Sequence, residues 1–321
     1  MHPSMTDFLE YLRTAGRFET ARGYGNALSH YHRWLIAAGL DPLTITTEGI
    51  RQYQRYLAED YRSPRGTTLG RNTQATRLAT VKAYHAWLAR RGLTLSDVSR
   101  GVQLPIIVRG PVRKDHVTLQ EATALLQTLS AEAAVFPEGC ARWAEAVRTL
   151  AFFALALATG RRRAGLRDLH LAHVDFVRQE IRVEREKGRA GRVLPVAAWA
   201  MVCLRTYVER ARPVLMWQAG NPWLFVGDLG PQLGRNTIGE MLTRAHAATV
   251  AANPDLVELA TKRLTPHSLR VTFAHLLFQG GANLRTINEL MLHESLGTTA
   301  RYTPLGLEDL QRICATAHPR G

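Results

Sequence analysis

Residues 265–304 read TPHSLRVTFAHLLFQGGANLRTINELMLHESLGTTARYTP and contain four side chains suited to one kind of chemistry. His267 and Arg270 are three positions apart, which on a helix places them on one face, about one turn from each other. His293 and Tyr302 follow, nine positions apart. Arginine and histidine donors can hold the oxygens of a phosphodiester while a tyrosine hydroxyl attacks the phosphorus. The stretch therefore predicts part of a phosphoryl-transfer site.

The composition favours a nucleic-acid partner. Forty-one Lys and Arg against 27 Asp and Glu give a formal net charge of +14 over 321 residues. Such an excess of positive charge favours a polyanion, and a solvated basic surface without a specific partner is the alternative. With hydrophobic residues at 46%, the chain is long enough for two domains, each with its own core.

Three features predict a cytoplasmic protein without membrane attachment. Cys140, Cys203 and Cys314 lack the close pairing of a zinc site, so we expect reduced thiols and no metal. The first twelve residues, MHPSMTDFLEYL, carry acids where a signal peptide is basic. The longest apolar run, residues 150–158, is too short to span a bilayer. DNA is accessible to such a protein.

Residues 5–92 show helical patterns and no strand pattern. Apolar side chains recur at helical spacing at 8–12, 24–35, 50–57 and 78–88. Thr47 is expected to cap the third helix, while Gly39 and Gly92 are expected to end the second and fourth. Four helices without strands predict a small helical bundle.

The last of these helices and its approach are basic, with amides between the charges. On a helix lying in or along a major groove, the charges contact phosphates and the amides reach bases. An ordinary solvated helix face is the alternative for each residue. The residues that we expect at DNA are Arg71, Asn72, Gln74, Arg77, Lys82 and Arg90.

Residues 100–116 read RGVQLPIIVRGPVRKDH, with two prolines, two glycines and several basic residues. This composition disfavours a helix and predicts an extended connection between domains. We place a helical DNA-binding domain at residues 1–107, a linker at 108–117 and a second domain at 118–321. Arg113 and Lys114 are then expected to follow the DNA backbone.

The second domain opens with helices. Thr118 and Glu121 form the pattern of a capping box, which begins a helix through about Leu129. A second helix is expected from about residue 142 to 158, followed by Thr-Gly-Arg-Arg-Arg at 159–163. Three consecutive arginines need a counter-charge in a cleft but only water on a surface. We expect Arg161 and Arg163 to bind DNA, with a structural or solubility role as the alternative.

A small antiparallel sheet is expected next. Residues 180–196 read EIRVEREKGRAGRVLPV, with alternation of period two on both sides of a Lys-Gly turn, which predicts a hairpin with Lys187 at its tip. Another alternating run lies at 174–176. Residues 197–210 and 237–252 are interpreted as helical, and 222–234 as a loop around a short apolar core segment. The whole is mostly α with a small β-sheet.

Four boxes in this chain carry a resemblance to a known family. Residues 158–166 read ATGRRRAGL, 187–195 read KGRAGRVLP, 267–270 read HSLR and 293–302 read HESLGTTARY. In this order they resemble the tyrosine recombinase (phage-integrase) family, with its boxes A-T-G-x-R, K-G-x-x-x-R-x-x-P and H-x-L-R and its final histidine and tyrosine. The resemblance covers about residue 118 to the C-terminus. The helical first domain looks like the family's SAM-like core-binding domain.

The resemblance implies roles for six residues. Tyr302 attacks the scissile phosphate to form a 3′-phosphotyrosine, His267 acts as base, and Arg162 and Arg270 hold the phosphate oxygens together with His293. Lys187 protonates the departing 5′ oxygen. The implied reaction is site-specific recombination through a Holliday junction, without metal, ATP or other cofactor. The expected partners are double-stranded DNA with a specific site and a homo-tetramer on that DNA, in which a helix at 305–315 docks on a neighbour.

Two other functions stay open. A type IB topoisomerase shares the chemistry but only relaxes supercoils. A DNA-binding or regulatory protein with a weakened catalytic site is the other, because Gly165 stands where the family usually has an acid. Leu292 and Val271 also depart from the residues common in the family.

Overall fold

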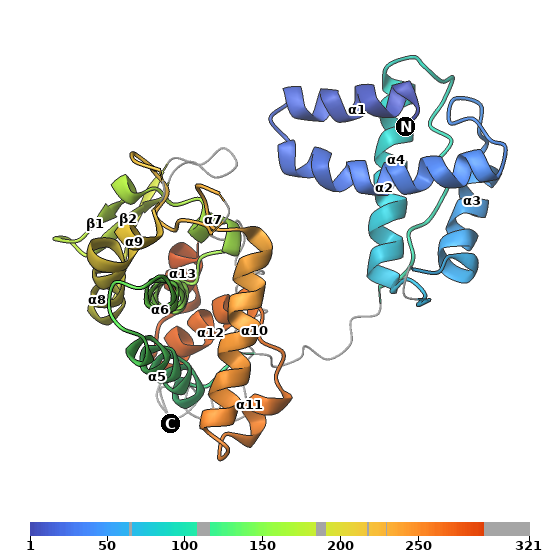
Figure 1. The fold of residues 1–321 in the computed structure, drawn as a ribbon. Helices are drawn as coiled ribbons and strands as arrows, with labels where there is room; N and C mark the ends of the chain where they lie inside the picture. Colours follow the sequence, from blue (N-terminus) through green and yellow to red (C-terminus); the bar gives the residue numbers. More distant parts are fainter. Residues whose placement is uncertain (64–65, 108–115, 184–190, 217, 229, 292–321) are drawn as a thin grey trace, which may run out of the picture. The chain divides into compact units, whose positions relative to one another are not determined.

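The structure, a computed structural model, describes residues 1–63, 66–107, 116–183, 191–216, 218–228 and 230–291. The described chain is mostly helical with one small antiparallel sheet, which confirms the predicted fold class. It divides into two compact units, Met1–Val112 and Arg113–Gly321 (Figure 1). The division falls inside the predicted linker, whose bounds stay a prediction because residues 108–115 lie outside the described ranges. Within those ranges, no helix has the length and apolar character that a membrane span requires.

The first unit contains the four predicted helices around one core. They are α1 (Pro3–Thr14), α2 (Phe18–Ala37), α3 (Thr47–Arg55) and α4 (Arg71–Arg90), with a π-helical turn, η1 (Tyr56–Asp60), continuing α3. The prediction that Thr47 caps α3 is wrong by one residue. The Thr46 hydroxyl accepts the bond from the Gly49 N–H at 3.3 Å, because Thr46 has the extended backbone of a cap and Thr47 is already helical.

Two histidines lie inside this first core, each paired with a tyrosine. The rings of His30 and His85 are 3.0 Å from the hydroxyls of Tyr53 and Tyr31, respectively. Burial lowers the pKa of His85 to about 4. Burial, followed by the charges of nearby arginines, lowers the pKa of His30 to about 4 as well. Both imidazoles are therefore neutral at pH 7 and serve as hydrogen-bonding parts of the core.

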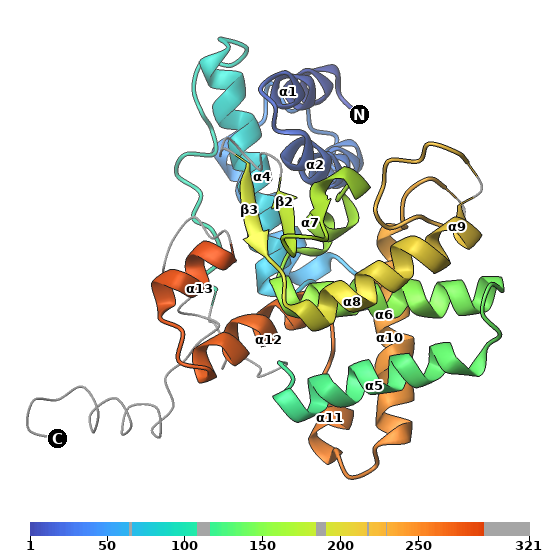
Figure 2. The ribbon, with the colours of Figure 1, turned by 90° about the vertical axis from the view of Figure 1, so that its left-hand side faces the viewer.

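The second unit is organised around α6 (Ala141–Thr159), whose residues 151–157 are all buried. Figure 2 shows α5 (Leu119–Val135) and α8 (Ala198–Thr206) running alongside α6. The capping box predicted for α5 is confirmed, with both Thr118 and Glu121 in place. The remaining helical elements are α7 (Arg163–Arg167), η2 (Leu171–His173), η3 (Tyr207–Ala211), α9 (Arg212–Leu215), α10 (Arg235–Ala252), α11 (Val257–Thr261), α12 (Pro266–Gln279) and α13 (Leu284–Leu290).

The sheet has the predicted hairpin. Strands β1 (Val174–Asp175), β2 (Glu180–Val183) and β3 (Arg192–Pro195) pair in that order, all antiparallel, with Ile181 opposite Leu194. Ile181 and Leu194 are buried, as the period-two pattern predicts for the face toward the core. The tip of the hairpin, with Lys187, lies outside the described residues.

Two buried arginines, Arg148 and Arg212, shape the loop before α10. Arg148 Nη1 donates to the Val226 carbonyl at 2.9 Å and to Asp228 Oδ1 at 2.7 Å. Arg212 Nη2 donates to the Asn221 and Trp223 carbonyls at 2.6 and 2.9 Å. These bonds satisfy carbonyls of an irregular segment that lies outside the three-stranded sheet. The predicted loop with its buried apolar segment is thus confirmed.

Candidate active site

The first turn of α12 carries His267 and Arg270 and is fixed by a capping box. Thr265 Oγ1 accepts from the Ser268 N–H at 3.1 Å, and Ser268 Oγ accepts from the Thr265 N–H at 2.6 Å. Pro266 occupies the first helical position, where its missing N–H costs nothing. The cap holds the helix start in one place, so that His267 and Arg270 share a face as the sequence predicted.

Arg270 joins three segments of the second unit. Its side chain is buried, and its Nη1 donates to the Gly160 carbonyl at 2.6 Å while its Nη2 donates to the Met291 carbonyl at 2.6 Å. Gly160 lies two residues before Arg162, and Met291 lies two residues before His293. One guanidinium therefore connects the first arginine box, the helix with His267 and the segment that leads to His293.

Gly160 permits this close approach of α6 and α12. It ends α6 in the left-handed conformation, with φ of 58°, and its carbonyl accepts from Arg270. A Cβ atom added there would lie 2.8 Å from Phe273 Cγ and closer still to Cδ1. The third position of the Ala-Thr-Gly box therefore requires glycine for two reasons. The backbone there is left-handed, and a side chain would collide with α12.

Arg162 and His267 are both exposed, and the positive charge of Arg162 acts on the His267 ring. Arg162 precedes α7 and has extended backbone dihedrals. Although the His267 ring has a solvent-facing side, partial desolvation lowers its pKa, and the positive charges of Arg270 and Arg162 lower it further. The imidazole is therefore neutral at pH 7 and able to accept a proton, as a general base must be.

The structure thus brings three of the six predicted catalytic residues together. Arg162 and Arg270 are near enough to His267 for their positive charges to lower its pKa, although Arg162 and His267 lie more than a hundred residues apart in sequence. Lys187, His293 and Tyr302 lie outside the described residues, so their positions stay predictions.

A groove of about 1440 Å³ adjoins the start of α12. Its wall includes Thr265 and Pro266, directly before His267, and the first half of α10. The charged residues that line it have both signs, with Arg163, Arg244, Lys262 and Arg263 among the cations. Arg163, one of the predicted DNA contacts, lines this groove, whereas Arg161 is buried. The DNA-binding assignment of both residues stays a prediction.

Sequence reasoning missed the contribution of α10 to this groove, although a repeat marks it. Residues 69–73 and 233–237 both read LGRNT. The first copy begins α4 and the second begins α10, and the glycines before the two helices have nearly the same dihedrals, φ −63° and ψ 147° or 144°. Asn236 and Thr237 of the second copy line the groove. The first copy contains Arg71 and Asn72, already predicted to contact DNA.

The DNA contacts predicted on α4 fall into two groups. Arg71, Asn72 and Arg90 are exposed. Lys82 instead donates to the Ser99 carbonyl at 2.8 Å and also to the Val102 carbonyl, and so fastens the chain after α4. Its role at DNA stays a prediction, as do those of the exposed residues.

Two further predicted contacts also have internal interactions. Gln74 Nε2 donates to the Leu69 carbonyl at 2.8 Å, and the Arg77 guanidinium lies 4.8 Å from the centre of the Tyr61 ring. Arg113 and Lys114 lie outside the described ranges. Among the residues that the structure describes, no group of three His, Cys, Asp or Glu side chains is placed to hold a metal ion.

Comparison with known protein families gives two matches that together cover most of the chain. Residues 117–306 match the phage integrase family, and residues 5–92 match the SAM-like N-terminal domain of phage integrases. The first match includes all six predicted catalytic residues.

Similar proteins carry recombinase names. The chain is 30% identical over the full length of both proteins to tyrosine recombinase XerC of Mycobacterium bovis. It is 29% identical to tyrosine recombinase XerC 2 of Ralstonia nicotianae, over 99% of this chain and 87% of that protein. It is 28% identical to tyrosine recombinase XerD of Corynebacterium glutamicum, over 92% of each.

Solved structures share the fold. XerH recombinase bound to its difH substrate superposes with a TM-score of 0.65, over 98% of this chain and 84% of that one, at 16% identity. The Tn1549 transposon integrase in complex with circular intermediate DNA superposes with a TM-score of 0.66, over 96% and 98%, at 17% identity. At these identities the likeness concerns the fold.

Proposed function

The chain belongs to the phage integrase family, the tyrosine recombinases, and on that premise we propose that it exchanges DNA strands at a specific site through a 3′-phosphotyrosine formed by Tyr302. The observation that carries this proposal is the position of Arg270. Its bonds to the Gly160 and Met291 carbonyls hold the chain two residues before Arg162, and the last described residue before His293, against the helix of His267. These residue types suit a phosphodiester in the pentavalent state, since planar guanidinium groups match its oxygens.

The proposed cleavage step conserves atoms and charge. The Tyr302 oxygen forms a bond to phosphorus while the bond from phosphorus to the 5′ oxygen breaks. The phenol proton goes to His267, and the departing 5′ oxygen takes a proton from Lys187. Attack by a 5′-hydroxyl of the second duplex reverses the step and joins the exchanged strands, first to a Holliday junction and then to products. The phosphotyrosine retains the bond energy, so no nucleotide is consumed.

The environment of His267 supports its role as base. A phenol has a pKa of about 10 and is mostly protonated at neutral pH, so it needs a base during attack. Partial desolvation and the charges of Arg270 and Arg162 lower the pKa of His267, which keeps the ring neutral until it accepts that proton. The same two arginines then face the charge that develops on the phosphate.

We infer that the partner is double-stranded DNA with a defined site, in the cytoplasm. The net charge of +14 favours a polyanion, and the groove beside His267 offers donors from α10 and from Arg263. Four copies on two duplexes are proposed, with residues 305–315 docking on a neighbour, because strand exchange needs two cleavages on each duplex.

The first test is a covalent trap. DNA sites selected from a random pool are nicked near the scissile phosphate, and the adduct is measured on denaturing gels. Wild-type protein is expected to form an adduct that Tyr302→Phe abolishes. Tyr11→Phe is the matched control, since Tyr11 is an exposed tyrosine of the first unit outside the proposed site, and it should form the adduct at the wild-type rate.

The products separate the alternatives. Recombinants between two selected sites indicate a recombinase, whereas relaxation of random supercoiled plasmid without recombinants indicates a type IB topoisomerase. One observation favours a weakened enzyme: Gly165 is buried in α7 and supplies no carboxylate where the family usually has an acid. Tight binding to selected DNA with no adduct from the wild type would establish that reading and refute the recombinase.

A further inference from the structure

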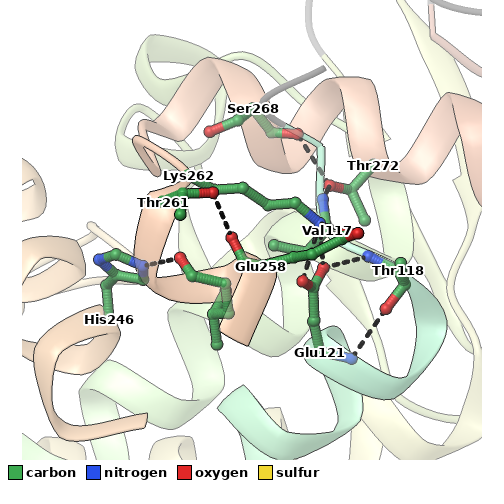
Figure 3. Close-up of polar contacts among 10 residues, drawn as sticks. Val117, Thr118, Glu121, His246, Glu258, Thr261, Lys262, Ser268 and Thr272 are labelled. Atoms are coloured by element: carbon green, nitrogen blue, oxygen red, sulfur yellow. Dashed lines mark hydrogen bonds and ion pairs between the residues drawn. The ribbon is translucent and has the colours of Figure 1, made fainter. Parts of the chain in front are cut away.

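A largely buried ion pair joins the first turn of α5 to the chain just before α12 (Figure 3). Lys262 Nζ lies 2.8 and 2.6 Å from the two carboxylate oxygens of Glu121, and the two side chains are 12% and 4% exposed. The same carboxylate accepts from the Thr118 N–H at 2.7 Å and so completes the capping box of α5. Glu121 therefore serves a local cap and a long-range contact at once.

A second contact joins the same short segment to the body of α12. The Val117 N–H donates to Thr272 Oγ1 at 3.0 Å, and the Thr272 hydroxyl donates to the Ser268 carbonyl at 2.9 Å (Figure 3). Val117 and Thr272 are both fully buried. This bond also satisfies an N–H that precedes the helix and has no partner inside it.

The two contacts lie on either side of the catalytic residues of α12. Lys262 precedes the Thr265 cap, and Thr272 follows Arg270 by two residues. His267 and Arg270 lie between these two points, and both points connect to residues 117–121. The Thr272 contact lies within α12, and the Lys262 contact holds the chain three residues before the cap at Thr265, so together they limit how far the start of the helix can pivot about Thr272. The middle of α11 is held as well, since the His246 ring lies 2.9 Å from the Leu259 carbonyl.

A capping box alone does not require the lysine. A glutamine at the third helical position makes the same bond to the cap N–H as a glutamate does. Burying an ammonium beside it carries a desolvation cost, and apolar residues of similar volume often stabilise a fold as well or better. General stability alone therefore does not explain the ion pair. Its place next to the start of α12 indicates a role in holding that helix.

We propose that Glu121 and Lys262 are positioning residues of the active site, which hold α12 so that His267 and Arg270 meet the scissile phosphate. This proposal rests on the proposed function. Neither residue touches the reacting atoms in it. Lys262 also lines the groove, so a direct contact to a DNA phosphate is the competing role that the experiment must separate.

The test compares variants that change charge with little change of shape. Glu121→Gln keeps the capping oxygen and removes the charge, and Lys262→Gln removes the other charge. The matched control is Glu258→Gln, because the Glu258 carboxylate lies 4.0 Å from the same ammonium but is 85% exposed. Lys262→Arg keeps a cation opposite Glu121 and is the conservative variant. A double variant, with glutamine at both positions, completes a mutant cycle.

Three quantities are measured on the full chain: the single-turnover rate of adduct formation at saturating protein, the DNA dissociation constant, and amide hydrogen exchange of residues 265–279. Glu121→Gln and Lys262→Gln are each expected to slow cleavage on the order of 100-fold, as a displacement near 1 Å does, with the dissociation constant unchanged. Exchange should accelerate in residues 265–279 and not across the unit. Glu258→Gln should match the wild type, and Lys262→Arg should recover most of the cleavage rate.

Several outcomes would overturn the proposal. If Lys262→Gln weakens DNA binding and lowers its salt dependence while Glu121→Gln does neither, Lys262 is a phosphate ligand. The positioning role is also refuted if Glu121→Gln and Lys262→Gln show the same amide hydrogen exchange in residues 265–279 as Glu258→Gln. It is refuted likewise if Lys262→Arg cleaves DNA as slowly as Lys262→Gln. If the wild type forms no adduct, the proposed function fails, and the exchange rates alone then decide whether the pair holds α12. If Glu121→Gln does not fold, the cleavage rates and amide exchange of Lys262→Arg and Lys262→Gln are compared instead, and they test the positioning role in the same way.

Discussion

The substitution Gly160→Ala should damage the second unit more than an alanine at an ordinary left-handed glycine. Two costs add at Gly160. An alanine at φ of 58° pays about 1–2 kcal/mol for the left-handed conformation. Its Cβ would also collide with the Phe273 ring, 2.8 Å from Cγ, and overpacking of this kind costs about 1–3 kcal/mol. We therefore expect a loss of about 2–5 kcal/mol in the free energy of unfolding.

Gly139→Ala is the matched control for the backbone cost. Gly139 lies in the same unit, at the turn before α6, with φ of 85° and nothing within 4 Å of an added Cβ. It should lose only the backbone cost, about 1–2 kcal/mol, because its added Cβ meets no neighbour. The difference between the two variants isolates the collision with Phe273. Phe273→Leu in the Gly160→Ala background should recover part of that difference, since a smaller side chain relieves the contact.

Thermal and urea unfolding of the full chain, followed by tryptophan fluorescence and circular dichroism, would measure these losses. A change of 1 kcal/mol shifts the Tm of a unit of this size by about 2–4 °C. Gly160→Ala should therefore lower the Tm for unfolding of the second unit by roughly 4–20 °C. Adduct formation should fall too, because the Gly160 carbonyl holds Arg270. Equal losses of stability in Gly160→Ala and Gly139→Ala would refute the reasoning.

Three further predictions concern charge. Lowering the pH from 7 to 4.5 should destabilise the first unit by about 2–3 kcal/mol for each of His30 and His85, measured by urea unfolding, because their pKa values of about 4 in the fold rise to about 6.5 on unfolding. Lys82→Met should lower the stability of the first unit, whereas Arg71→Ala should leave stability unchanged, weaken DNA binding and lower the salt slope of binding by about 1. Lys187→Ala should slow cleavage of ordinary DNA by about 10²–10⁴-fold but spare DNA with a 5′-thio leaving group, which needs no acid.

Each of these predictions has a clear counter-result. For the histidines the sign is fixed: a lowered pKa in the fold gives stability that is present above pH 6.5 and is lost as the pH falls toward 4. His85→Gln, which keeps a hydrogen-bonding group for Tyr31, should lose less over that range; the same loss as in the wild type would contradict the assignment. A stable Lys82→Met protein with weaker DNA binding would make Lys82 a DNA ligand. Equal slowing on both DNA substrates would remove Lys187 from the acid role.

The sequence predicted the longer helices and the hairpin, but not α7, α9, α11 or α13, because the signals of the former are local and strong. Apolar periodicity marks α6 and β2, and Thr118 with Glu121 marks the start of α5 within four residues. The contact between Glu121 and Lys262 has no such signal, since the partners are 141 residues apart and Lys262 has the sequence context of a surface lysine. The buried arginines Arg148 and Arg212 escaped prediction for the same reason, because the carbonyls that they satisfy belong to another segment of the fold.

The candidate site was predictable in its chemistry and not in its construction. His267 and Arg270 were recognised because a phosphodiester needs donors and a base, and their spacing on a helix is a local property. That Arg270 also holds the Gly160 and Met291 carbonyls depends on how α6, α12 and α13 pack. Carbonyl groups carry no net charge, so the guanidinium keeps its positive charge for a phosphate while it fixes the backbone around it. Replacing Arg270 would therefore remove both the charge and the scaffold, whereas replacing the exposed Arg162 would remove the charge alone, and only the second variant isolates the contribution of an arginine to catalysis.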